Sequence, residues 1–169
     1  EGDPDAWIPA REFSILLAAV DMLMHPMLAD FGAVWGRRFV TSRAGEFVGD
    51  LTTSQLDALS RMFHQKRSTS ILHVASRLQR GLERLPDWFF PLEAAVDERV
   101  SPSQIAFHAL ARPVNLPLFC SVIAGFAGGI LELHRIPCLR IHEESCMTTG
   151  HTACSFVILF EPETPLSFF

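Results

Sequence analysis

Three cysteines and two glutamates in the last third of the chain are the residues whose types best suit chemistry. Cys120, Cys146 and Cys154 are joined by Glu143 and Glu144, which come just before the second thiol. Thiolate sulfur suits zinc, a carboxylate oxygen is an acceptable fourth ligand, and four protein ligands close a tetrahedral shell. These residue types therefore allow a structural rather than a catalytic zinc site.

The spacing of the thiols leaves two other interpretations open. The three cysteines are separated by 26 and 8 residues, with no CxxC pair. Free thiols are common in protein cores, and Cys146 and Cys154 could also form a redox pair. No basic segment leads into an apolar stretch at the N-terminus, so the sequence predicts a cytoplasmic protein, in which clustered cysteines favour metal ligation.

Composition limits the other classes of function. The chain has 169 residues, 49% of them apolar, which is ample for one domain with a core. Its 14 basic and 19 acidic residues give a net charge of −5, which argues against direct contact with nucleic acid. The longest apolar run, residues 116–131, is too short to span a bilayer comfortably.

The first half of the chain carries apolar residues at helical spacing. This period predicts helices over 13–24, 31–39, 56–63 and 71–85, with a break at 45–51. From residue 88 the period changes. We expect strands at 88–96 and 104–110, a buried helix at 118–134, and strands at 137–143 and 153–161.

This order predicts an α+β domain, in which N-terminal helices precede a strand-strand-helix-strand-strand unit with an antiparallel sheet. We divide it into a helical part at 1–87, a part with the sheet, the buried helix and the metal site at 88–162, and a tail at 163–169. Cys120 then opens the buried helix, Cys146 lies between the last two strands, and Cys154 begins the final strand.

The pattern around these cysteines resembles the 4-vinyl reductase domain family, over residues 100–160. In that family a cysteine begins a glycine-containing helix, and a later strand ends in Glu-x-x-Cys, x3-Gly, x3-Cys before an apolar strand. Cys120, Glu143, Cys146, Gly150 and Cys154 match each of those positions. The motif is most similar to the sensor domains of phenol-responsive, enhancer-binding transcription activators.

The resemblance implies a zinc ion held by Cys120, Glu143, Cys146 and Cys154. His142, Glu144 and His151 are rival fourth ligands, but the family pattern selects Glu143. Cys138 falls outside the pattern, and its place in a predicted strand indicates a core residue.

The same family belongs to a wider group of folds that includes haem-based nitric oxide sensors and vesicle-tethering subunits. Members typically enclose an apolar pocket, for which the candidates here are Trp88, Phe107, His108 and Phe126. His108 and Trp88 would supply the polar contacts that orient a ligand. For the aromatic residues a place in the core is the simpler interpretation, and for His108 an edge-exposed or hydrogen-bonded ring is an equal alternative.

Haem is an alternative ligand, with His64 and His73 as candidate axial residues. The related nitric oxide sensors hold haem with a Tyr-x-Ser-x-Arg motif. This chain has no tyrosine, and the comparable stretch from His108 to Arg112 also lacks the serine.

We therefore expect a sensor domain that binds a small apolar or aromatic molecule and signals to a partner domain. The resemblance implies a homodimer formed through the N-terminal helices. The alternatives are a protein that binds a tetrapyrrole or is related to tetrapyrrole vinyl reductases, and a protein-interaction module of the vesicle-tethering type. The sequence shows neither a glycine-rich dinucleotide motif nor a Walker loop, so catalysis is the weaker expectation.

Overall fold

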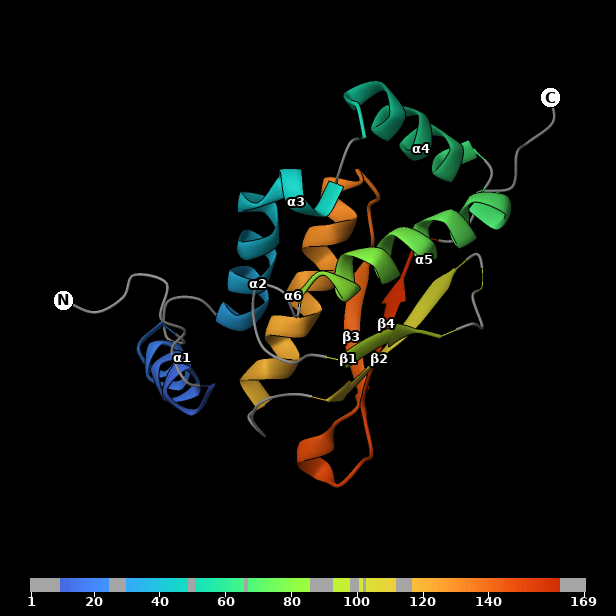
Figure 1. Cartoon of the computed structure of the whole chain (residues 1–169). Helices are drawn as coiled ribbons and strands as arrows, with labels where there is room; N and C mark the ends of the chain where they lie inside the picture. The colour runs from blue at the N-terminus through green and yellow to red at the C-terminus, as the bar shows by residue number, and fades with distance from the viewer. Residues whose placement is uncertain are drawn as a thin grey trace.

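The computed structural model describes residues 10–24, 30–48, 51–65, 67–85, 93–97, 101, 103–111 and 117–161. Figure 1 shows the helices gathered around one side of a small sheet. The elements in chain order are α1 (Ala10–Met24), α2 (Phe31–Ser42), α3 (Ala44–Val48), α4 (Thr53–Gln65), α5 (Arg67–Glu83), β1 (Glu93–Val96), β2 (Gln104–Ala111), α6 (Pro117–Leu133), β3 (Arg140–Ser145), η2 (Met147–Thr149) and β4 (Cys154–Leu159).

The α+β class and the strand-strand-helix-strand-strand order are confirmed. The break expected at 45–51 is wrong in part, because Ala44–Val48 forms the short helix α3. The reason is tertiary, since Phe47 of this segment is buried in the core. The strand expected at 88–96 is seen only as β1, because residues 86–92 lie outside the described residues. Strand β3 begins three residues later than expected, at Arg140, beyond Pro137.

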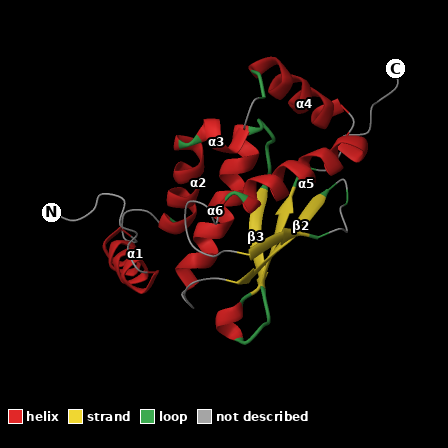
Figure 2. Cartoon of the chain, viewed as in Figure 1, coloured by secondary structure: helices red, strands yellow, loops and turns green. Residues whose placement is uncertain are grey.

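The four described strands form one antiparallel sheet in the order β1-β2-β4-β3, so β4 lies inside the sheet, between β2 and β3 (Figure 2). Alternation along β2 buries Ile105, Phe107 and Ala109 completely. Phe107 stacks on Phe156 of β4, with ring centroids 4.9 Å apart. This face of the sheet forms part of the core.

Helices α2 and α6 run side by side in the same direction, since Gly32 faces Ser121 and Gly129 faces Val40. Their backbones almost touch. A Cβ atom on Gly36 would lie 2.3 Å from the carbonyl oxygen of Val122. Glycine is the residue that permits such an approach. The pair fixes the start of α6, where Cys120 lies.

The far edge of the sheet is held by α5. The Gln79 side-chain oxygen accepts a 2.6 Å hydrogen bond from the backbone N–H of Val96 in β1. Leu78 and Leu82 on the same helix are fully buried. Among the described helices, none has both the length and the apolarity needed to cross a membrane.

Candidate metal centre

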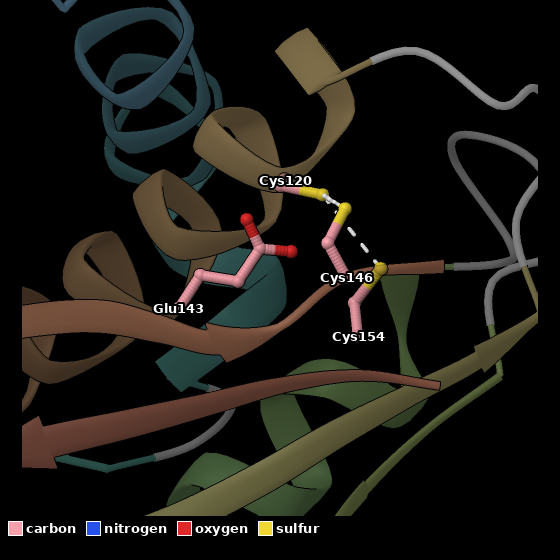
Figure 3. Close-up of side chains that lie close together, drawn as sticks. All are labelled: Cys120, Glu143, Cys146 and Cys154. Atoms are coloured by element: carbon pink, nitrogen blue, oxygen red, sulfur yellow. Dashed lines mark hydrogen bonds between the residues drawn. The ribbon is translucent and has the colours of Figure 1, made fainter. Parts of the chain in front are cut away.

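Three elements bring the four predicted ligands together (Figure 3). Cys120 lies in the first turn of α6, Glu143 lies on β3, Cys146 follows β3, and Cys154 begins β4. One ligand atom from each residue lies within 4.8 Å of all the others. The sulfur of Cys120 is 3.4 Å from that of Cys146 and 3.7 Å from that of Cys154.

The turn between β3 and β4 makes Cys146 and Cys154 neighbours. After Cys146 the chain makes one 3-10 turn, and the backbone N–H groups of Thr149 and His151 both donate to the Cys146 carbonyl, at 3.1 and 3.3 Å. Gly150 then takes a φ of 96°, a left-handed conformation that favours glycine. The backbone N–H of Met147 also points at the Cys154 sulfur, 3.4 Å away.

A register shift between Glu143 and Ser145 helps to place the acidic ligand. Glu143 pairs with Phe156 and Ser145 with Ser155, so Glu144 is an extra residue in the ladder. Such a bulge redirects side chains at the end of a strand.

The cluster combines a buried interior with an exposed rim. Cys120 and Cys154 are buried, Cys146 is half-buried, and Glu143 is exposed. Burial raises the pKa of the Cys120 thiol well above its usual range, and hydrogen bonds with Glu143 and Cys146 add to this. Burial and a hydrogen bond with Glu143 act in the same direction on Cys146, but hydrogen bonds with the side chain and backbone of Thr148 and with Cys120 outweigh them and lower its pKa.

This donor set fits zinc. Three sulfurs and one carboxylate oxygen are enough for a closed tetrahedral shell, and a divalent cation stabilises the thiolate form that burial alone disfavours. Zinc bound here would join the start of α6 to the ends of β3 and β4.

The rival fourth ligands lie elsewhere. His142 and Glu144 flank Glu143 on the strand and face each other, with the His142 Nε2 3.9 Å from a Glu144 oxygen. His151 is exposed on the turn. Cys138, which we expected in a strand, lies before β3 and is half-buried.

Three of the four pocket candidates lie in the described part of the chain. Phe107 is a core residue, and Phe126 of α6 is buried against Phe39, with centroids 5.6 Å apart. His108 lies on the other face of β2, where its Nδ1 is 2.9 Å from the Ser155 hydroxyl and its Nε2 is 3.4 Å from an Asp97 oxygen. Trp88 lies outside the described residues.

The structure also has a cavity that no pattern in the sequence predicted. It measures about 410 Å³ and lies between α2, α6 and β3. Cys120 and Glu143 of the metal cluster line it, as do Arg37 and Arg140. Arg37 and Cys138 also line a second, more open cavity of about 600 Å³. Local spacing cannot signal such a space, because three elements far apart in the chain enclose it.

Both histidines that we considered as axial haem ligands lie in the described part of the chain, and His64 lines the second cavity. His64 and His73 are both exposed. His134 is buried, but it lines neither of the two cavities described above. Desolvation, with Arg77 and Arg80 nearby, lowers its pKa to about 4.

The fold is similar to that of an H-NOX protein from Shewanella oneidensis. Solved in the Fe(II)NO ligation state, that protein is 16% identical over 95% of this chain and 83% of its own, with a TM-score of 0.55. An Fe(II) structure of a triple mutant of an H-NOX protein from the same organism matches at 18% identity over 99% of this chain and 84% of its own, with a TM-score of 0.54. An NMR structure of the SO2144 H-NOX domain in the Fe(II)CO ligation state is 18% identical over 88% of this chain and 75% of its own, with a TM-score of 0.51.

Comparison of the sequence with known proteins found no relative. No protein-family profile matches the chain, and no curated protein matches it. At this level of identity the structural likeness concerns the fold. It confirms the expected nitric-oxide-sensor-like architecture, and the chain therefore has an H-NOX-like α+β fold.

Proposed function

We propose that this chain is a small-molecule-binding sensor domain with a structural zinc ion held by Cys120, Glu143, Cys146 and Cys154. The observation that carries the proposal is the convergence of four ligand atoms, from residues spread over 34 positions of the chain, to within 4.8 Å. Three of them are sulfurs, and sulfur with one carboxylate oxygen favours zinc over magnesium or calcium.

In this proposal the ion fixes the helix on the sheet. The start of α6 carries Cys120, and the turn between β3 and β4 carries Cys146 and Cys154. The hydrogen bonds that join the Cys120 sulfur to the sulfurs of Cys146 and Cys154 are of a weak kind, and a bound cation would add stronger links. The site requires reduced cysteines, which is consistent with a cytoplasmic protein.

The sensor part of the proposal is supported by the fold and by the cavity. The cavity beside the metal cluster, at about 410 Å³, falls within the size range of small-molecule sites, which is about 300–1,000 Å³. The resemblance of the cysteine pattern to 4-vinyl reductase domains adds the expectation of an apolar or aromatic ligand. Binding would be relayed to a partner domain, or between copies in a homodimer.

Metal analysis tests the zinc site, and the chain supplies its own control. Purified protein should contain about one zinc per chain, and Cys146→Ser should lose most of it. Cys138→Ser should keep the full amount, because Cys138 lies outside the cluster. A metal-free parent protein, or equal zinc loss in both variants, would contradict the proposal.

Ligand binding separates the sensor from its alternatives. A small molecule that binds only the folded state raises the unfolding temperature as its concentration rises. Phenols, aromatic hydrocarbons and porphyrins are suitable probes. A Soret absorption band after haemin is added would support the tetrapyrrole alternative, which the H-NOX-like fold suggests. No shift with any probe would favour the vesicle-tethering alternative, a protein-interaction module.

A further inference from the structure

The three thiols of the metal cluster lie close enough together for a second kind of chemistry. The Cys120 sulfur is 3.4 Å from the Cys146 sulfur and 3.7 Å from the Cys154 sulfur (Figure 3). The sulfur atoms of a disulfide are about 2.05 Å apart, so the closer pair would have to approach by about 1.4 Å. A small local shift is therefore enough to join Cys120 to Cys146.

The surrounding backbone holds Cys154 more firmly than Cys146. Cys154 begins β4, an inner strand of the sheet, and pairs with Ala109 of β2. Its sulfur also accepts a hydrogen bond from the backbone N–H of Met147, at 3.4 Å. Cys146 comes after the last paired residue of β3 and has no partner in the described strand ladders. Cys146 is therefore the thiol that can best move toward Cys120.

The same residue is the most accessible of the three thiols. Cys120 and Cys154 are buried, whereas Cys146 is half-buried. Its sulfur lies 2.8 Å from the hydroxyl of Thr148, which is exposed on the turn between β3 and β4. A small oxidant that arrives from solvent therefore reaches the Cys146 sulfur first, with the Cys120 sulfur directly behind it.

We propose that peroxide oxidation joins Cys120 and Cys146 in a disulfide and thereby releases the bound metal ion. The inference rests on the proposed zinc site and adds a means of regulating it. Disulfides in cytoplasmic proteins are usually transient and redox-sensing, which is the role that this bond would have.

The reaction balances with hydrogen peroxide as the oxidant. The Cys146 thiolate attacks one peroxide oxygen, the O–O bond breaks, and the sulfur becomes a sulfenic acid while hydroxide leaves. The Cys120 thiolate then attacks this sulfur, the S–O bond breaks, and a second hydroxide leaves. The two sulfurs together lose two electrons, which the peroxide gains, and solvent protons convert both hydroxides to water.

The disulfide removes two of the four proposed ligands. Only Cys154 and Glu143 would remain, and a structural zinc site needs four protein ligands. Because the bond joins the start of α6 to the end of β3, it would keep these two elements together after the ion has left. Reduction by a dithiol would return both thiols, and the site could then be filled again.

Peroxide treatment of the zinc-loaded protein tests the inference. A chromogenic chelator reports the released zinc, and tandem mass spectrometry of unreduced peptides identifies the linked cysteines. We expect about one zinc to be released per chain and Cys120 to be linked to Cys146. Dithiothreitol followed by zinc should restore the metal content. Cys138→Ser is the matched control and should respond as the parent protein does, because Cys138 lies outside the cluster.

Zinc that stays bound during oxidation, a disulfide through Cys154 or Cys138, or sulfinic acid at Cys146 without a disulfide would overturn the inference. Zinc content before peroxide is added reports separately on the proposed metal site. The mapping is repeated on metal-free protein, so that the disulfide is tested even if the site holds no zinc. There, Cys154→Ser should still form the bond between Cys120 and Cys146, and Cys146→Ser should not form a disulfide with Cys120.

Discussion

Gly125 of α6 lies against Ala33 of α2 so closely that a Cβ atom on the glycine would be 2.3 Å from the Ala33 carbonyl oxygen. A backbone carbonyl cannot move aside as a flexible side chain can. The contact therefore sets the distance between the two helices that line the cavity.

Gly125→Ala should destabilise the protein by about 1–3 kcal/mol, as overpacking in a core does. Gly128→Ala is the matched control on the same helix, because its new methyl group would meet only ordinary contacts, the nearest at 3.6 Å. That variant should be neutral or gain up to about 1 kcal/mol from helix propensity. Urea unfolding measures both, and equal stability of the two variants would show that the helices do not pack this tightly.

Zinc removal should weaken the whole fold. In the proposed site the ion would bind only the folded protein and would join α6 to β3 and β4, so chelation should lower the unfolding temperature by about 10 °C under conditions of tight binding. Differential scanning calorimetry with and without a chelator measures the shift. Cys154→Ser should unfold at the lowered temperature and respond little to the chelator. A chelator effect of full size in this variant would argue against the site.

His134 should make stability depend on pH. Its Nδ1 is buried and has no hydrogen-bond partner among the residues that the structure describes, and its folded-state pKa is about 4 against an ordinary value of 6.5. The unfolded chain therefore takes up a proton first as the pH falls. The contribution of His134 to stability is constant above about pH 6.5 and declines toward pH 4, by about 2 kcal/mol between pH 7 and pH 5.

Urea unfolding at these two pH values should show a smaller loss of stability for His134→Leu than for the parent protein. The comparison with the parent corrects for other groups that titrate in this range. If the two proteins lose stability equally, the ring is not held neutral in the folded state.

Helix α1 should take part in the expected homodimer. Figure 1 shows it beside α2, away from the sheet, and four of its large apolar side chains are exposed: Ile15, Leu16, Met22 and Leu23. Burying such a face is favourable by roughly 25 cal/mol for each Å². Leu16→Glu combined with Leu23→Glu should shift the protein from dimer to monomer in sedimentation velocity runs, with zinc content unchanged. A parent protein that is already monomeric would refute this role.

The sequence was most informative where one element carries its own pattern. The apolar runs of α6 and β4, and the alternation of β2, predicted these elements to within a few residues. Helix α3 was not predicted, because its formation depends on burying Phe47 in a core that other segments form.

The same limit applied to the candidate site, where local patterns were predictable and contacts between distant elements were not. Residue types alone placed the cysteines and a glutamate as possible ligands, and only the family pattern distinguished Glu143 from Glu144. The cavity and the buried ring of His134 arise from contacts between distant elements, which no local spacing encodes. His108 has Ser155 and Asp97 as its hydrogen-bonding partners, and the alternation of residues along one strand could not indicate them.

X-ray absorption at the zinc edge is the sharpest test of the four-ligand site, because it reports which atoms surround the ion in the purified protein. We expect three sulfur neighbours at about 2.3 Å and one oxygen at about 2.0 Å, with the oxygen signal changed in Glu143→Gln. A shell with two or fewer sulfurs, or a protein that binds no zinc when fully reduced, would contradict the site.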